Sequence, residues 1–310
     1  MKGGARDEAR AARAGVLFGL AAYGSWGVFP LYFKLIRAAS PAEILAHRTI
    51  WSFVLLFAIV AFRGRLGAIR PALARPRDLA RAAATTALIA TNWFVYIWAV
   101  NNDHVLEASL GYFVNPLVNV LLGMVFLRER LRGLQTASVL LAAAGVGWLA
   151  WAVGRAPVIP LTLALTFGLY GLLRKQARIG GPEGLLVETA LLSPFAVGYL
   201  FHLAGQGRLT FLHATSGLDL LLMSSGAVTA LPLIWFVESA RRLRLTTLGF
   251  LQYLSPTLQF LLGVFLFAEP FPPERRVAFG LIWAALALFT VDATLALRRA
   301  EPRPPRPAAR

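Results

Sequence analysis

Two segments of the chain repeat one spacing of polar and helix-breaking residues. The first segment has Tyr112, Asn115, Pro116, Asn119 and Gly123 at positions i, i+3, i+4, i+7 and i+11. The same steps in the second segment give Gln252, Ser255, Pro256, Gln259 and Gly263. Residues at these spacings share one helix face, so each segment presents a stripe of amide and hydroxyl groups. Such groups favour reversible hydrogen bonding to a ligand.

Aromatic side chains extend this candidate binding set. Asn92 and Tyr96 are four residues apart on one predicted helix, with Trp93 beside Asn92. Trp26 and Tyr170 occupy two similar motifs, Gly-Ser-Trp-Gly and Gly-Leu-Tyr-Gly. Amides among aromatic walls suit an amphipathic or aromatic solute. The alternative is that the amides join neighbouring helices by hydrogen bonds, and the sequence leaves both interpretations open.

Ionisable residues inside apolar segments are costly and are therefore candidates for function. Arg48 lies a full turn inside its segment, and we assign it, with His47 and Glu188, to coupling or gating. The alternative for Glu188 is a structural ion pair with a nearby basic residue such as Arg178.

The chain carries no recognisable catalytic or metal-binding set. It has no cysteine and four histidines, no two of which are spaced i, i+4. It also lacks the His-Glu-x-x-His and Gly-x-Ser-x-Gly motifs. We therefore predict no catalytic residue, no metal site and no cofactor, and a membrane-embedded enzyme is the least favoured alternative.

The elements that must position these residues are membrane-spanning helices. Hydrophobic residues make up 57% of the chain and charged residues 15%, against roughly 45–50% and 25% in soluble domains. A spanning helix needs about 20 mostly apolar residues. Ten segments meet or approach this length: 14–33, 44–62, 82–100, 108–127, 134–153, 158–173, 185–203, 218–237, 245–267 and 277–297.

Basic residues between these segments account for the net charge of +16. With the N-terminus in the cytoplasm, 24 of the 31 Lys and Arg residues fall on the cytoplasmic side and six on the outer side. Basic residues are retained in the cytoplasm, so we predict that both ends, residues 1–13 and 298–310, are cytoplasmic. The second end is a basic tail that we expect to be disordered. Anionic lipids explain the charge, and we predict no nucleic-acid partner.

The chain also contains an internal repeat. Residues 116–129 read PLVNVLLGMVFLRE and residues 256–269 read PTLQFLLGVFLFAE, at an offset of 140. These anchors pair the fourth predicted helix with the ninth, and an odd number of helices per repeat inverts the second copy. We predict two inverted five-helix repeats, 14–153 and 157–297, around a cavity near the membrane midplane, as in secondary transporters.

Several motifs resemble those of one family. They are EILAHR at 43–48, NW at 92–93, WAVNN at 98–102, EASLGY at 107–112, NP at 115–116 and RLRLTTLG at 242–249. Over roughly residues 14–297 the sequence is similar to the EamA-type branch of the drug/metabolite transporter superfamily and, within it, to the RarD proteins. The resemblance implies ten helices in two EamA-like halves around a central cavity, and it names no solute. Tyr170 stands where the first half has Trp26, so the two half-sites differ.

We therefore predict an all-α inner-membrane transporter that moves a small amphipathic or aromatic metabolite, or a drug-like molecule, outward by alternating access. A channel or a structural membrane subunit is the main alternative, although the chain shows no ring of like charges and no filter motif. The expected partners are the solute and membrane lipids. The oligomeric state stays open between monomer and homodimer.

Overall fold

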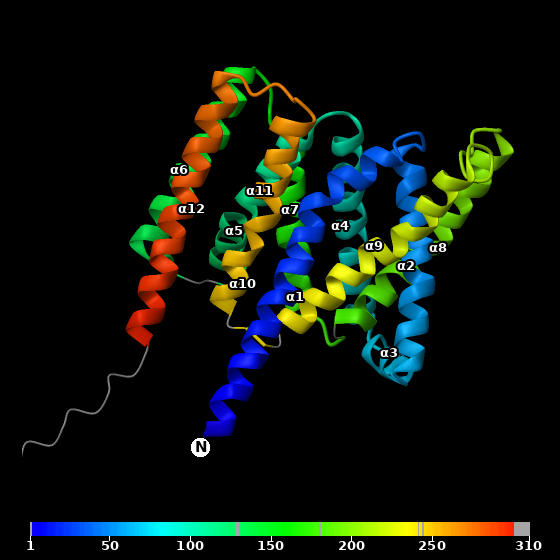
Figure 1. Cartoon of the computed structure of the whole chain (residues 1–310), viewed down its shortest axis with the longest axis horizontal. Helices are drawn as coiled ribbons and strands as arrows, with labels where there is room; N and C mark the ends of the chain where they lie inside the picture. The colour runs from blue at the N-terminus through cyan, green and yellow to red at the C-terminus, as the bar shows by residue number, and fades with distance from the viewer. Residues whose placement is uncertain (1, 128–129, 180, 241, 244, 301–310) are drawn as a thin grey trace, which may run out of the picture. The chain divides into compact units, whose positions relative to one another are not determined.

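The computed structural model describes residues 2–127, 130–179, 181–240, 242–243 and 245–300, and these residues form helices and no strand (Figure 1). The long helices are α1 (Lys2–Leu35), α2 (Pro41–Phe62), α4 (Pro76–Asn101), α5 (Val105–Leu127), α6 (Gly133–Val153), α7 (Val158–Lys175), α8 (Gly181–Gly205), α9 (Ser216–Ala240) and α12 (Pro273–Ala300). The shorter elements are a 3-10 turn (Leu66–Ala68), α3 (Ile69–Ala72), α10 (Leu245–Gln252), α11 (Leu254–Leu261) and a π-helical turn (Leu262–Leu266).

Eight helices of the described part are long and apolar enough to cross a membrane. They correspond to eight of the ten predicted segments, so the prediction of an all-α, multi-helix membrane protein is confirmed at this level. The other two segments are shorter apolar helices, Val158–Arg174 and Leu254–Leu266. The number ten and the inverted arrangement of the repeats stay predictions.

The ninth predicted segment is interrupted rather than continuous. We predicted one helix over 245–267, but α10 ends at Gln252 and α11 begins at Leu254. Pro256 has no backbone N–H to donate to the carbonyl of Gln252, four residues earlier, so one helical hydrogen bond is missing at this point. A π-helical turn follows at Leu262–Leu266.

The ends of the helices follow from local sequence. Ser40 caps α2, because its side chain accepts a hydrogen bond from the Glu43 backbone N–H at 3.2 Å, and Pro41 occupies the first helical position. Gly154 ends α6 with φ of 71°, a left-handed conformation that favours glycine. At the end of the chain, α12 continues to Ala300 through the first residues of the predicted tail. The rest of that tail, 301–310, and Glu129 lie outside the described residues.

The chain divides into two compact units. Unit 1 comprises Met1–Asn119 and Pro157–Pro270, and unit 2 comprises Val120–Ala156 and Phe271–Arg310. This division differs from the predicted repeats 14–153 and 157–297, because the last helix of each predicted repeat belongs to unit 2. The repeat boundaries therefore stay a prediction from sequence.

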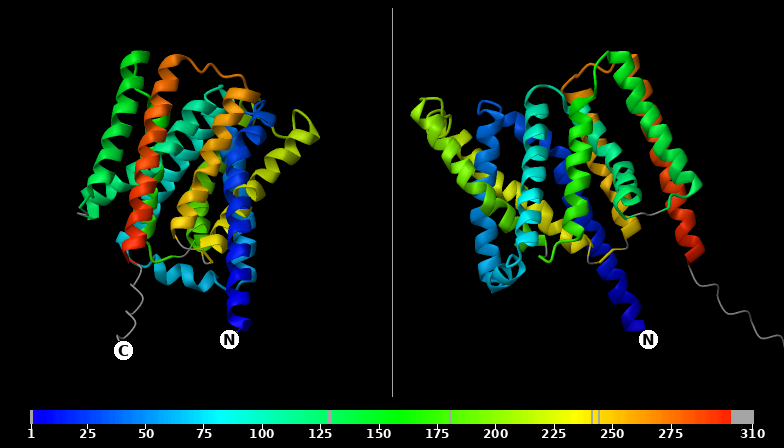
Figure 2. Two further views of the ribbon diagram at one scale, coloured as in Figure 1. Left: turned by 60° about the vertical axis from the view of Figure 1, so that its left-hand side comes forward. Right: turned by 180° about the vertical axis from the view of Figure 1, so that it is seen from behind.

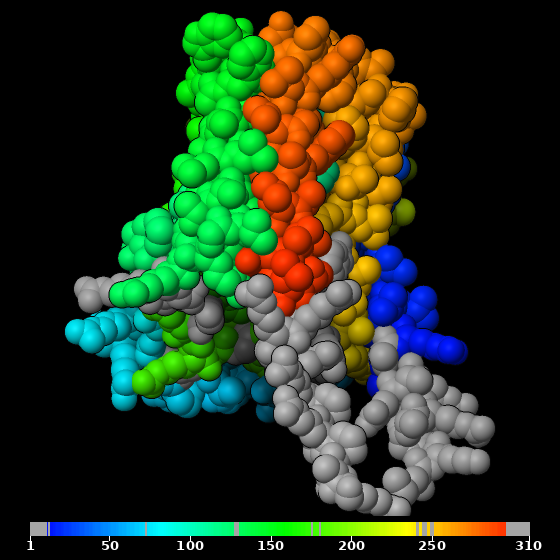
Figure 3. Space-filling view, turned by 90° about the vertical axis from the view of Figure 1, so that its left-hand side faces the viewer, coloured from blue at the N-terminus to red at the C-terminus, as the bar shows by residue number. Residues whose placement is uncertain are grey.

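Unit 2 is built on the pair α6 and α12, which lie side by side in Figure 3. Arg132 Nε donates to Asp292 Oδ2 at 2.9 Å, which ties the start of α6 to α12. Gly145 lets the two helices approach, since a methyl group at its Cα would lie 3.2 Å from the Ala278 carbonyl oxygen.

Unit 1 holds all the candidate site residues. The connections α1–α2, α4–α5 and α8–α9 lie at one end of this unit, which we call the upper end after Figures 1 and 2. The connections α2–α4 and α7–α8 lie at the opposite, lower end. The buried core runs between these ends, with Phe33, Tyr96 and Leu163 in one apolar cluster and Leu56, Trp93 and Leu185 in another.

Candidate functional site

Asn92 joins α4 to α7 inside unit 1. Its side chain is 1% exposed, and its Nδ2 donates to the Leu163 carbonyl oxygen and to Thr166 Oγ1, both at 3.0 Å. Tyr112 of α5 donates its hydroxyl hydrogen to Asn92 Oδ1 at 3.3 Å. The Asn92 amide therefore has partners for both its nitrogen and its oxygen, as expected of a residue that holds helices together.

A second polar contact joins α1 to α11. Gln259 Nε2 donates to the Trp26 carbonyl oxygen at 3.1 Å and to Ser255 Oγ at 3.2 Å. The half-buried Trp26 ring packs against Tyr23 and Phe236, with centroids 5.3 and 5.9 Å away. Gln259 Oε1 is buried and has no hydrogen-bond partner among the described residues, so this amide keeps one acceptor available.

The remaining stripe residues have fewer partners. Asn115 is 1% exposed, and its Oδ1 has no hydrogen-bond partner among the described residues. Asn119, one helical turn further along α5, is exposed. Gln252 is half-buried at the end of α10, where the helix breaks. Asn115 is thus the stripe residue whose burial is least explained by contacts within the protein.

Arg48 lies near the upper end among aromatic rings. Its guanidinium carbon is 4.2 Å from the centroid of Trp93 and 5.7 Å from that of Phe33. Tyr96 packs against Phe33 and against Tyr112, with centroids 5.9 and 5.7 Å apart. The structure therefore brings Arg48, Trp93, Tyr96 and Tyr112 into one group.

The environment of Arg48 leaves its charge poorly compensated. The side chain is 5% exposed, and it forms no ion pair or hydrogen bond within the described part of the chain. A desolvated cation–π contact contributes about 2 kcal/mol, and placing an Arg inside a membrane helix costs about 3 kcal/mol or more. The two contacts therefore offset much of this cost, but they supply neither a negative charge nor an acceptor for the N–H groups of the guanidinium.

His47 faces a different part of the upper end. Its ring centroid lies 4.5 Å from that of Phe211, its side chain is 3% exposed, and its Nε2 has no hydrogen-bond partner among the described residues. Glu43, in the first turn of the same helix, accepts hydrogen bonds from the backbone N–H groups of Thr210 and Phe211 at 2.8 and 3.0 Å. Glu43 therefore anchors the α8–α9 connection.

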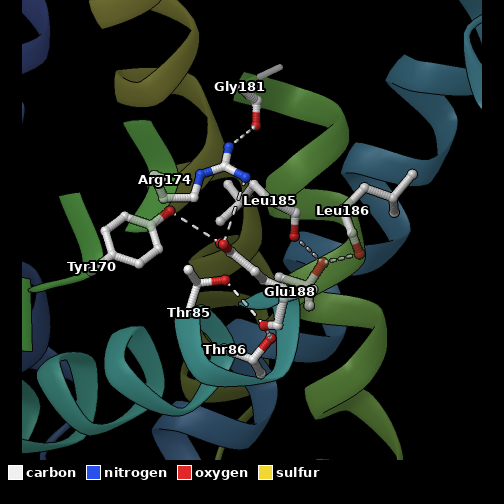
Figure 4. Close-up of polar contacts among 10 residues, drawn as sticks. Thr85, Thr86, Tyr170, Arg174, Gly181, Leu185, Leu186 and Glu188 are labelled. Atoms are coloured by element: carbon white, nitrogen blue, oxygen red, sulfur yellow. Dashed lines mark hydrogen bonds and ion pairs between the residues drawn. The ribbon is translucent and has the colours of Figure 1, made fainter. Parts of the chain in front are cut away.

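Glu188 lies at the lower end, between α4, α7 and α8 (Figure 4). Tyr170 donates its hydroxyl hydrogen to Glu188 Oε2 at 3.0 Å, and Arg174 Nη1 lies 3.7 Å from Glu188 Oε1. The carboxylate is 2% exposed. Its ionic partner is therefore Arg174, one turn after Tyr170, and not Arg178, which lies 3.7 Å from Asp78.

A small pocket opens beside this carboxylate. Its volume is about 20 Å³, room for one water molecule, and Thr85, Arg174 and Glu188 are among its walls. Water at this place would give the buried carboxylate a path to the lower end. Among the predicted residues, Glu188 and Tyr170 are thus in contact near the lower end of unit 1, whereas Arg48 lies nearer its upper end.

Sequence reasoning missed the correspondence between α2 and α8. The two helices begin 140 residues apart, at Pro41 and Gly181, which is also the offset between the repeated segments 116–129 and 256–269. Each has Glu at its third position and Thr at its ninth, and Thr49 and Thr189 donate to the carbonyls of Leu45 and Leu185 at 2.8 and 2.9 Å. The eighth positions are Arg48 and Glu188, which differ in charge; the signal was visible as EILAHRT against EGLLVET.

Known proteins share both the sequence and the fold. The model of the EamA-like transporter family matches residues 13–151. A protein called RarD from Streptomyces exfoliatus is 47% identical over 94% of this chain and 92% of its own length. Protein RarD from Escherichia coli strain K12 is 45% identical over 94% of this chain and 99% of its own length.

The chain belongs to the RarD family of EamA-like transporters. The family resemblance inferred from the motifs is therefore confirmed. A more distant RarD relative from Pseudomonas aeruginosa, called chloramphenicol-sensitive, is 34% identical over 92% of this chain and 96% of its own length. One solved crystal structure has the same fold, with a TM-score of 0.56 at 24% identity over 91% of this chain and 98% of that chain.

RarD-family membership settles the class of the protein. Relatives from Vibrio cholerae and Bacillus subtilis, each 44% identical, are called transporters. The chain is therefore a multi-pass inner-membrane transporter that handles a small solute and lies in the lipid bilayer.

Proposed function

We propose that this transporter exports a small amphipathic or aromatic metabolite, or a drug-like molecule, by alternating access. Its ten hydrophobic segments form two inverted five-helix repeats, with both termini in the cytoplasm. Two features support the inversion: the matched register of α2 and α8, and their opposite directions along unit 1 (Figure 1). In such transporters the solute binds near the midplane, between the repeats.

Two observations together carry the proposal. One helix is broken inside an apolar segment, and the repeat-equivalent helix has a buried amide oxygen with no hydrogen-bond partner among the described residues. The segment from Leu245 to Leu266 is interrupted before Leu254, and discontinuous membrane helices mark solute sites because they expose backbone groups. On the repeat-equivalent helix α5, Asn115 Oδ1 has no hydrogen-bond partner among the residues that the structure describes. A solute that donates a hydrogen bond would satisfy this acceptor.

The proposed site combines that amide with the aromatic residues of unit 1. Its members are Trp26, Asn92, Trp93, Tyr96, Tyr112, Asn115, Asn119, Tyr170, Gln252, Ser255 and Gln259. Asn92 and Gln259 have helix-joining contacts, so within this set they shape the walls of the cavity more than they bind the solute. Aromatic surface beside a few polar groups suits an amphipathic solute.

We further propose that His47, Arg48 and Glu188 provide coupling or gating. His47 and Glu188 are the groups able to take up and release a proton, one at each end of unit 1. The pocket beside Glu188 supports the lower-end assignment, since a proton carrier needs contact with water.

Counterflow in proteoliposomes tests the proposed site. The full chain is reconstituted into proteoliposomes, which are loaded with one unlabelled solute from a panel of aromatic metabolites and amino acids. Uptake of the same solute in radiolabelled form is then measured. We expect saturable uptake for at least one solute and a loss of about tenfold or more in Asn115→Ala, as removal of one buried hydrogen bond predicts.

Asn102→Ala is the matched control, because Asn102 is an exposed amide whose side chain donates to the Trp98 carbonyl oxygen of the adjoining helix α4. Its uptake should equal that of the wild type. Saturable uptake unchanged in Asn115→Ala, Asn119→Ala and Gln252→Ala would place the solute site elsewhere.

A further inference from the structure

Arg48 is surrounded by groups that interact with its charge but do not neutralise it. Trp93 and Phe33 supply cation–π contacts, and Tyr32, Tyr96 and Tyr112 lie within electrostatic range of the guanidinium. A cation–π contact uses the charge of Arg and leaves its five N–H donors without acceptors. Arg48 Nε is fully enclosed and has no acceptor among the described residues.

The acidic side chains of the upper end are already engaged elsewhere. Each of these acids interacts with a backbone N–H group or a basic side chain other than Arg48. The acids are Glu43, Asp103, Glu107, Asp219 and Glu269. Glu188, the acid at the equivalent position of α8, is paired with Arg174 at the lower end. No carboxylate in the described part of unit 1 is therefore placed to neutralise Arg48.

We infer that Arg48 binds a carboxylate carried by the transported solute, with the aromatic body of the solute packed against Trp93 and Tyr96. One cation calls for one negative charge, and the planar guanidinium matches a carboxylate through two parallel hydrogen bonds. The Tyr96 hydroxyl has no hydrogen-bond partner within the described part of the chain, and it adds a second donor near Arg48. This inference rests on the proposed function and narrows its substrate class to aromatic carboxylates.

The depth of Arg48 along α2 favours an occupied site. It is the eighth residue of α2, about 10 Å along the helix from the upper end. A carboxylate bound there neutralises the charge of Arg48 inside the membrane, so the occupied state is favoured over the empty one. An empty site retains that penalty.

Binding to the purified full chain in detergent tests the inference without requiring transport. The probes are two matched pairs, indole-3-acetate with indole-3-acetamide and phenylacetate with phenylacetamide, and thermal stabilisation reports occupancy. We expect each acid to bind at least about tenfold more tightly than its amide, because the acid alone forms charge-assisted hydrogen bonds. Arg48→Gln should remove this preference while leaving the weaker binding of the amide.

Two variants keep the result interpretable. Arg37→Gln loses the same charge from an exposed position in the α1–α2 connection and should retain the preference for the acid. Arg48→Lys keeps the charge but not the planar fork, so it should retain the preference in weakened form and serves if Arg48→Gln does not fold.

Three outcomes would overturn the inference: equal binding of acid and amide by the wild type, an undiminished preference in Arg48→Gln, or equal stabilisation by sodium chloride or acetate alone. A preference for the acid without counterflow of any solute would instead reject the transport mechanism and keep the anion site.

Discussion

Asn92 and Asn115 are both fully buried asparagines, yet the structure surrounds them differently. Asn92 bonds to α7 and to Tyr112, whereas Asn115 Oδ1 has no partner among the described residues. From sequence, each was assigned to solute binding, with helix joining as the alternative. The distinction depends on which groups of other helices come within 3 Å, and no spacing along one helix contains that information.

Asn92→Ala should lower stability by about 1–2 kcal/mol, because the Tyr112 hydroxyl and the Leu163 carbonyl oxygen would lose a partner. Thermal unfolding in detergent measures the change. Asn115→Ala is the matched comparison and should unfold at nearly the wild-type temperature. If Asn115→Ala were the less stable of the two, the division into helix-joining and solute-binding amides would be wrong.

Glu188→Gln should separate solute binding from proton coupling. The amide retains the hydrogen bond from Tyr170 but cannot carry a proton, so stimulation of transport by an imposed pH step should disappear while counterflow persists. The control is Glu238→Gln, since Glu238 is a half-buried acid that is ion-paired with Arg242. Equal stimulation by the pH step in Glu188→Gln and wild type would remove Glu188 from the coupling mechanism.

At the scale of elements, glycine determines how closely α2 and α9 pack. A methyl group on Gly226 of α9 would lie 2.7 Å from the Ser52 backbone nitrogen and closer still to the carbonyl group of Trp51. Backbone atoms cannot move aside as the end of a side chain can. Gly226 is therefore a place where the helix pair depends on the absence of a side chain.

Gly226→Ala should lower the free energy of unfolding by about 1–3 kcal/mol, the usual range for overpacking a close contact. The control is Gly198→Ala on α8, where a methyl group would meet nothing within 4 Å. It should leave stability unchanged or raise it by up to about 1 kcal/mol, because Ala favours a helix over Gly. Wild-type unfolding temperatures in Gly226→Ala would contradict the close approach of the two helices.

The elements also show the limit of hydrophobic patterning. Eight apolar segments became helices of membrane length, and the bounds of these candidate spans lie within six residues of those predicted. The segment 245–267 looked equally continuous by composition, but it breaks ahead of Pro256. Pro116 occupies the equivalent place in α5 without a break, so the residue type alone did not determine the outcome.

For the whole molecule, the absence of cysteine makes topology directly measurable. Single cysteines at Gly67, in the α2–α4 connection, and at Gln206, in the α8–α9 connection, should label on opposite sides of the membrane. With both termini cytoplasmic, a membrane-impermeant maleimide should label Gln206→Cys in intact cells and Gly67→Cys only in inverted vesicles. The reverse pattern would contradict the predicted orientation, and labelling on one side would contradict the opposite placement of the two connections.

Composition and charge distribution by themselves determined that this is a helical membrane protein, because lipid cannot hydrogen-bond to exposed backbone and long apolar runs must therefore form helices. Short motifs determined the family. Only the tertiary structure decided which buried polar groups satisfy one another and which, like Arg48 and Asn115, do not. The reason is that hydrogen-bond partners come from helices far apart in sequence. A buried group stays unsatisfied when none of the helices packed around it offers a partner.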